Sequence, residues 1–262
     1  MTRSHPPALV VHDVVKRFGG LVALDQVRLV VPDGAIVGLI GPNGAGKTTL
    51  FDCVTGLQTL GRGGGRIVLF GQDVTDWPPH ERARLGVART YQRLELFTGL
   101  TVRENVVAAY EARLGRASAW SDLLALPPTV EARAEAEEQT KGVLEATGLD
   151  HIADVPAGDL PLGQARTVEF ARALVSAPRL LLLDEPNSGL RGDESARVAR
   201  LVRLARDTYR TAVLVVEHDM GFVLDLVDYV YVLDFGRLLA HGEPAEIRDH
   251  PAVQAAYLGQ PA

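Results

Sequence analysis

Cysteine is almost absent from this 262-residue chain: Cys53 is the only one, so no internal disulfide can form. The seven histidines are scattered, without the close spacing of a zinc site. Basic charge is not in excess, because 27 Lys and Arg residues stand against 33 Asp and Glu, for a net charge of −6. Such a chain has no basic field to recruit nucleic acid. The composition fits a reducing compartment and argues against zinc-binding and nucleic-acid-binding classes.

Long hydrophobic runs are also missing. No apolar stretch approaches the roughly 18 residues that a membrane span needs. The N-terminus offers only the short apolar stretch Ala8 to Val11, so we do not expect a signal peptide. Hydrophobic residues nevertheless make up 47% of the chain and charged residues 23%, as in globular proteins. We expect a folded domain; if it serves a membrane, it does so from the surface, through a partner.

Helix and strand patterns alternate along most of the chain, which predicts an α/β fold with a parallel sheet. The segments "LVVHDVVKRF" and "LVALDQVRLVV" are strand-like, and a buried strand at 35–40 leads into a helix near Lys47. Beyond residue 165, helices alternate with strands at 180–183 and 213–216 and in "YVYVL". A helical region interrupts this pattern. Its first helix is predicted by Thr101 and Glu104, which have the spacing of a capping box.

The octapeptide "GPNGAGKT" satisfies the phosphate-loop pattern G-x-x-x-x-G-K-[ST] between a buried strand and a helix. Glycines allow consecutive N–H groups to turn toward phosphate oxygens, and the helix N-terminus adds partial positive charge. Lys47 is expected to reach the β- and γ-phosphates, and the Thr48 hydroxyl to ligate Mg²⁺. The predicted nucleotide-binding residues are Gly41, Pro42, Asn43, Gly44, Ala45, Gly46, Lys47, Thr48 and Thr49.

Two acidic residues, Asp184 and Glu185, end the leucine-rich strand "LLLLD". In a parallel sheet the carboxyl ends of the strands face the ligand crevice. Asp184 is therefore predicted to hold Mg²⁺, and Glu185 to polarise an attacking water as the general base.

His218 follows the next predicted strand and is expected to face the same crevice, where it can touch the γ-phosphate. Gln92 lies where the sheet core gives way to the helical region, so its amide can bond both the Mg²⁺ shell and the helices. A structural histidine and a surface glutamine are the alternatives.

With these motifs in order, the chain resembles the ATP-binding subunits of ABC transporters, most closely the branched-chain amino-acid (or urea/amide) importer group. The similarity covers about residues 8–259. The segments that carry it are "GLVALDQV", "IVGLIGPNGAGKTTLF", "RTYQRLELFTGLTVRENV", "VEFARAL", "LLLDEPNSGL", "EHDM" and "AAYLG".

The resemblance implies one domain over 1–262. Its P-loop NTPase core comprises a parallel sheet with flanking helices and N-terminal antiparallel strands, at about 8–92 and 179–262. A helical lobe is inserted at about 93–178. Phe18 takes the position of an aromatic residue that stacks on adenine, the alternative being a core phenylalanine.

The resemblance also implies partners. Two such subunits would sandwich two ATP molecules with Mg²⁺, each bound by one subunit's phosphate loop and by the other's signature residues, here Gly163 and Gln164. A second ATPase subunit, two transmembrane permeases and, indirectly, a solute-binding protein are expected, at the cytoplasmic face of the membrane.

Two positions depart from the family pattern. Pro161 replaces the signature serine, so a helix can start there while a hydroxyl donor to the γ-phosphate is lost. Arg191 stands where Asp or Asn is usual, and Asp193 is either its substitute or a plain helix cap. We therefore expect unequal ATP sites and favour a heterodimer over a homodimer.

Several alternatives remain. The transported solute could differ, with urea and amides as candidates, or the chain could be a largely non-hydrolysing regulatory subunit. ATPases of DNA repair or translation tend to carry coiled-coil or zinc insertions or tandem domains, which this sequence lacks. A GTPase or kinase would not explain the signature-like helix, Gln92 or His218.

Overall fold

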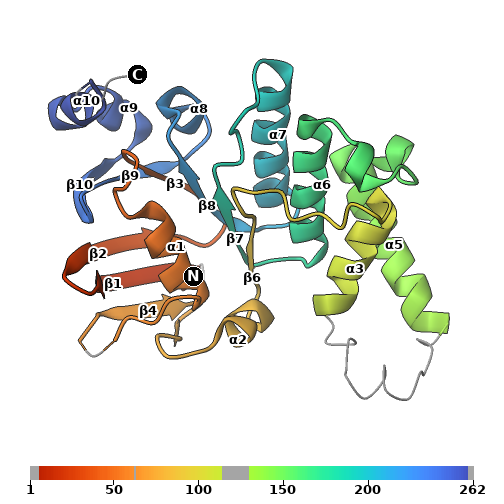
Figure 1. Ribbon diagram of the computed structural model, residues 1–262, viewed down its shortest axis with the longest axis horizontal. Helices are drawn as coiled ribbons and strands as arrows, with labels where there is room; N and C mark the ends of the chain where they lie inside the picture. Colours follow the sequence, from red (N-terminus) through yellow and green to blue (C-terminus); the bar gives the residue numbers. More distant parts are fainter. Residues whose placement is uncertain (1–5, 62, 114–129, 259–262) are drawn as a thin grey trace, which may run out of the picture.

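The computed structural model describes residues 6–61, 63–113 and 130–258, and two β-sheets form its centre (Figure 1). An antiparallel sheet has the order β2-β1-β4-β5, and a six-stranded sheet has the order β10-β9-β3-β8-β7-β6. The antiparallel sheet consists of β1 (Leu9–Phe18), β2 (Leu21–Val31), β4 (Arg66–Leu69) and β5 (Gln72–Asp73). The six-stranded sheet consists of β3 (Ile36–Ile40), β6 (Val87–Arg89), β7 (Leu180–Asp184), β8 (Ala212–Glu217), β9 (Tyr229–Asp234) and β10 (Arg237–Gly242).

The neighbouring strands from β9 to β6 pair in parallel, as the alternating pattern predicted. Their leucine and valine side chains are buried on both faces of the sheet. In β7, Leu180 and Leu182 pack toward the antiparallel sheet and α1 (Lys47–Thr55), whereas Leu181 and Leu183 pack toward the helices on the opposite face. Continuous burial explains why this strand lacks a polar side until Asp184.

The edge strand β10 pairs antiparallel with β9 and was not predicted. The hairpin between them turns at Phe235 and Gly236, which have φ angles of 41° and 77°. Phe235 is 88% exposed at this turn. The turn is not recognisable from the sequence, because two-residue turns with positive φ at both positions normally carry Asn, Asp or Gly there, and here the first residue is a phenylalanine.

Helices surround the six-stranded sheet and form a separate group to one side. They are α1, α2 (Pro79–Arg84), α3 (Val102–Arg113), α5 (Val130–Thr147), α6 (Leu162–Val175), α7 (Asp193–Asp207), α8 (Met220–Leu224), α9 (Pro244–Arg248) and α10 (Pro251–Leu258), with 3₁₀ turns at Asp150–Ile152 and Ala157–Asp159. In Figure 1, α3 and α5 lie beyond α6, on the opposite side of β7 from α1.

We call the group α3, α5 and α6 the helical lobe, because these helices pack against one another. The predicted capping box begins α3. Glu104 donates its N–H to the Thr101 hydroxyl (3.2 Å), and its carboxylate accepts the Thr101 N–H (2.8 Å). The chain enters the lobe after β6 and returns through α6 to β7. Residues 114–129, inside the expected lobe, lie outside the described residues.

Candidate functional site

The phosphate loop joins β3 to α1, and its path requires glycine at two positions. Gly41 has φ 153°, and a Cβ there would lie 2.0 Å from the carbonyl oxygen of Leu233. Gly46 has φ 103°, and a Cβ there would lie 2.6 Å from the carbonyl oxygen of Ala23. Both contacts are with backbone and cannot relax by a side-chain rotation. The sequence pattern therefore reflects real steric limits.

The remaining loop residues present an accessible surface at the start of α1. Asn43, Gly44 and Thr48 are exposed, Pro42, Gly46 and Thr49 are half-buried, and Gly41, Ala45 and Lys47 are buried. The α1 N-terminus has no side-chain cap, so its first N–H groups are available to an anion.

Lys47 is 6% exposed, and its ammonium donates to the carbonyl oxygens of Gly41 (2.6 Å) and Pro42 (2.9 Å). Burial lowers the pKa of Lys47, while Glu185 and Asp184 act in the opposite direction. The loop carbonyls thus hold the ammonium inside the loop, close to where a phosphate would enter.

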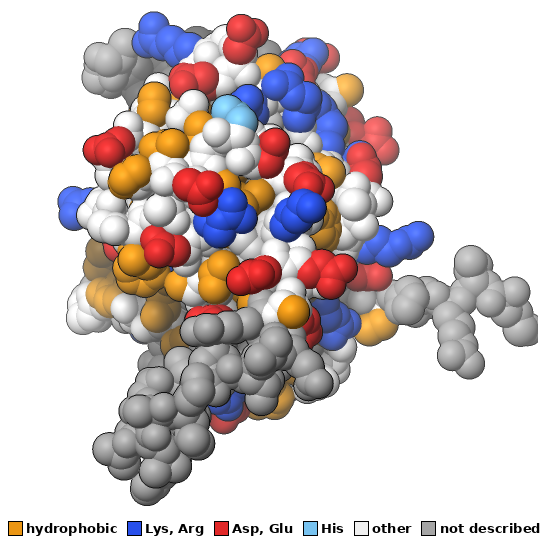
Figure 2. All heavy atoms as spheres, turned by 90° about the vertical axis from the view of Figure 1, so that its right-hand side faces the viewer, with side chains coloured by type: hydrophobic (Ala, Val, Ile, Leu, Met, Phe, Trp, Pro, Cys, Tyr) orange, Lys and Arg blue, Asp and Glu red, His pale blue; other side chains and the backbone are white. Residues whose placement is uncertain are grey.

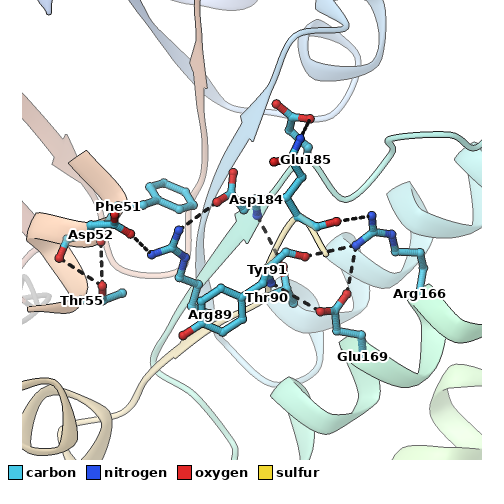
Figure 3. Close-up of polar contacts among 11 residues, drawn as sticks. Phe51, Asp52, Thr55, Arg89, Thr90, Tyr91, Arg166, Glu169, Asp184 and Glu185 are labelled. Atoms are coloured by element: carbon cyan, nitrogen blue, oxygen red, sulfur yellow. Dashed lines mark hydrogen bonds and ion pairs between the residues drawn. The ribbon is translucent and has the colours of Figure 1, made fainter. Parts of the chain in front are cut away.

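Asp184 lies 5% exposed at the end of β7, where it forms an ion pair that sequence reasoning missed. Arg89, at the end of β6, donates to Asp184 (2.9 Å) and to Asp52 of α1 (2.6 Å). Figure 3 shows Arg89 between the two carboxylates. Burial raises the pKa of Asp184, and the bond from Arg89 opposes this. Both Asp184 and Arg89 end neighbouring parallel strands, so the strand-end rule could have identified the pair.

The side chains of Gln92 and His218 both lie close to that of Glu185. The Gln92 amide Nε2 donates to Glu185 Oε2 at 3.1 Å, and His218 Nδ1 lies 3.8 Å from the same oxygen. Glu185 has φ 49°, an uncommon left-handed conformation for a glutamate. Its N–H donates to the carbonyl of Val216 in β8 (2.9 Å), which fixes the residue where β7 ends.

Glu217 is a buried residue of this site that the sequence analysis did not single out. It precedes His218, is 0% exposed, and accepts the Asn187 N–H (2.8 Å) and the His218 N–H (3.3 Å). Burial raises the pKa of Glu217 despite these bonds. The carboxylate joins the loop after Glu185 to the loop that carries His218.

Phe18 ends β1 and is 45% exposed, so the alternative of a core phenylalanine is wrong. The Lys16 ammonium lies 4.9 Å from the centre of its ring. The ring is thus an accessible aromatic surface at the end of the antiparallel sheet.

Gly163 and Gln164 lie in the first turn of α6, apart from the phosphate loop. A Cβ on Gly163 would lie 2.2 Å from Glu194 Oε1 of α7, so this turn packs on α7. Two details of the prediction are wrong. Pro161, with ψ 153°, is the N-cap and not part of the first helical turn. Asp193 is not a cap either, because Gly192 caps α7 and Asp193 is its first helical residue.

The residues present fit a nucleotide with Mg²⁺. Gly41 and Gly46 leave the loop backbone free of side chains, and Lys47 supplies a buried positive charge. The oxygen donors of Thr48, Asp184 and Gln92 are of the hard type that Mg²⁺ prefers.

Two family models match the chain. The model described as ABC transporter matches residues 24–188, and the model described as branched-chain amino acid ATP-binding cassette transporter matches residues 237–262. Among curated proteins, the chain is 41% identical over 254 residues to the high-affinity branched-chain amino acid transport ATP-binding protein LivG of Escherichia coli (strain K12), covering 97% of this chain and 98% of that protein. It is 40% identical, with the same coverage, to the high-affinity branched-chain amino acid transport ATP-binding protein BraF of Pseudomonas aeruginosa.

Solved structures agree in fold. An ATP-binding cassette of an ABC transporter in its ADP conformation has a TM-score of 0.83 and 30% identity, covering 97% of this chain and 100% of that chain. A nucleotide-free ATP-binding cassette from an ABC transporter has a TM-score of 0.81 and 29% identity, with the same coverage.

Proposed function

Because the chain belongs to the ABC transporter family, we propose that it is the ATP-hydrolysing subunit of an importer for branched-chain amino acids. The observation that supports ATP hydrolysis is the position of Gln92 and His218 beside Glu185. Gln92 Nε2 lies 3.1 Å and His218 Nδ1 lies 3.8 Å from Glu185 Oε2. Similarity to LivG and BraF over nearly the whole chain supports the choice of solute, as does the match of the C-terminal residues to the branched-chain amino-acid group.

The chemistry assigned to each residue follows from its position. Backbone N–H groups from Asn43 to Lys47 would bind the β- and γ-phosphates, with the Lys47 ammonium turning from the loop carbonyls to phosphate oxygens. Glu185 would accept a proton from the attacking water, and His218 would contact the γ-phosphate. The Phe18 ring would stack on adenine.

Thr48, Asp184 and Gln92 would hold Mg²⁺, which when bound neutralises charge on the transferred phosphoryl group. Arg89 contacts Asp184 at 2.9 Å and thus holds its carboxylate in place beside the loop.

We assign the hydrolytic core to about 8–92 and 179–262 and the lobe to about 93–178. Gly163 and Gln164, half-buried in the first turn of α6, would contact the nucleotide of a second ATPase subunit. Across the described ranges, no helix has the length and apolar character of a membrane span. Two permease subunits would supply the spans, and this chain would lie at their cytoplasmic face, with a solute-binding protein acting on the far side.

On the lobe side, acidic and basic side chains are interspersed over the described surface (Figure 2). Among the described residues, the view in Figure 2 shows no continuous basic surface of the kind that nucleic-acid binding calls for.

The test is to isolate this chain with its native partners from membranes and to measure ATPase activity in proteoliposomes. Leucine, isoleucine or valine with the solute-binding protein should stimulate hydrolysis, and urea or amides should not. Stimulation by urea alone would contradict the assigned solute. Recovery of DNA or ribosomes without permeases would contradict the transporter function itself.

A further inference from the structure

Two side chains of α6, Arg166 and Glu169, hold the main chain of Tyr91 and Gln92; we call them the α6 pair. The Arg166 guanidinium donates to the carbonyl oxygens of Tyr91 (3.2 Å) and Gln92 (2.7 Å). Glu169 accepts the Tyr91 N–H at 3.4 Å and pairs with Arg166 at 3.2 Å. Figure 3 shows the two side chains aimed at this segment from α6. The lobe thus binds the main chain of Tyr91 and Gln92 through side chains of α6.

The α6 pair is buried, with side-chain exposures of 9% for Arg166 and 8% for Glu169. A buried ion pair adds little net stability, because desolvation offsets its attraction. Its geometry is specific, however, since the planar guanidinium directs its N–H donors rigidly, here to two carbonyl oxygens and one carboxylate. These features suit positioning of a segment better than general stabilisation.

The other side of the segment is tied to the core. Arg89, two residues before Tyr91, is bound by Asp52 and Asp184, and its guanidinium lies 5.0 Å from the Tyr91 ring centre. Residues 90–92 therefore connect Arg89, which is bound to the core, with the main-chain groups that the α6 pair of the lobe binds. Any movement of α6 relative to β7 must change the path of this short segment.

Gln92 is exposed, and its amide makes the 3.1 Å contact to Glu185. Its orientation therefore depends on its backbone, which the α6 pair holds. Gly163 lies in the first turn of the same helix, and its carbonyl accepts the Thr167 hydroxyl at 2.9 Å, so Gly163 and the α6 pair share neighbouring turns.

We propose that Arg166 and Glu169 are positioning residues that set the contact between Gln92 and Glu185 according to the orientation of α6. The proposal rests on the proposed function, in which the start of α6 meets the partner's nucleotide. Occupancy of the partner's site then affects hydrolysis in this subunit through Arg166, Gln92 and Glu185 in turn.

A double-mutant cycle in the assembled transporter tests this. Wild type, Arg166→Gln, Gln92→Ala and the double variant are compared by kcat and KM for ATP. Loss of a charged hydrogen bond typically corresponds to about 10-fold or more, so Arg166→Gln should lower kcat by about that factor. KM should change by less than about threefold, because the phosphate loop is untouched. If Arg166 acts through Gln92, the double variant loses no more than Gln92→Ala alone.

Hydrogen exchange supplies a readout apart from activity. In Arg166→Gln, the Tyr91 amide should exchange faster, while the core of α6 keeps its protection. Arg166→Lys keeps the positive charge but not the planar guanidinium, so its effects on kcat and on Tyr91 exchange should be intermediate. This variant replaces Arg166→Gln in the test if the glutamine variant fails to assemble.

The control is Arg82→Gln, because Arg82 is 2% exposed and donates to the carbonyls of Cys53 and Val54, away from Gln92. The Arg82→Gln variant should have a lower melting temperature, but its effect on kcat should not depend on whether Gln92 is present. The positioning role is overturned if kcat of the double variant falls by the product of the two single-variant factors. It is also overturned if Arg166→Gln leaves kcat unchanged. An inactive wild-type complex would instead contradict the proposed function.

Discussion

Glu217 shows how one residue can hold two segments of the site. Its carboxylate accepts N–H groups from Asn187 and His218 while being fully buried. Burial favours the protonated form, so the folded pKa of Glu217 lies above the usual value of 4.5. Its contribution to stability is therefore complete below pH 4.5 and is lost as the pH rises through the folded pKa.

Glu217→Gln removes this titration and keeps one oxygen acceptor. Relative to wild type, the variant's free energy of unfolding should rise as the pH rises above 4.5, because only the wild type loses a proton there that its folded state holds more tightly. Urea denaturation of both proteins between about pH 4 and pH 8 measures the difference. A difference that stays constant over this range would show that the burial of Glu217 is not linked to its protonation.

The residues that follow a recognisable strand or loop could be predicted from the sequence. Asp184 ends the apolar strand β7, Glu185 follows it, His218 follows β8, and the phosphate loop has a fixed spacing. Arg166 and Glu169 could not be found in this way, because their targets are backbone groups more than seventy residues earlier in the chain. Such contacts depend on how the lobe packs and leave no local pattern.

At the scale of elements, the start of α6 is the part of this chain that we propose to meet a partner's nucleotide. Pro161 is the N-cap without a side-chain hydrogen bond, and Leu162 is 44% exposed beside it. The sequence predicted the helix but misplaced its start by one residue, because both N-cap and first-turn positions accept the φ of proline. The missing hydroxyl is therefore at the helix N-terminus itself, where a serine would be both cap and donor.

Pro161→Ser should restore a donor to the partner's γ-phosphate. With this subunit's own site silenced by Glu185→Gln, ATPase activity of the assembled transporter should rise by about 10-fold, as expected for a hydrogen bond to a charged group. Pro161→Ala is the matched control, because it removes the ring without adding a hydroxyl. An equal rise in the alanine variant would assign the effect to the ring.

At the scale of the whole molecule, the two faces of this subunit are unequal. Its own site has the phosphate loop, Glu185 and His218 in place, whereas the surface that we propose meets a partner carries Pro161 and, in the loop before α7, the exposed Arg191. This difference favours a heterodimer in which hydrolysis occurs mainly at this subunit's phosphate loop.

Glu185→Gln in this chain should therefore reduce transport-coupled ATPase activity more than the equivalent change in the partner. Steady-state hydrolysis by the two singly substituted complexes measures this, with Glu138→Gln on the exposed surface of α5 as a control. A larger loss from the partner's substitution, or recovery of a homodimer of this chain, would contradict the asymmetry.

The sheet order has a mechanical consequence. The chain enters the lobe from β6 and returns from it to β7, and these are adjacent strands at one edge of the six-stranded sheet. Both covalent links to the lobe thus lie along a single line, with β8 between that line and the phosphate-loop strand β3. A lobe attached in this way can swing about the sheet edge without breaking a ladder hydrogen bond. What resists the swing is the apolar core that the lobe shares with the sheet face, together with the polar side chains that cross the line, such as Arg166.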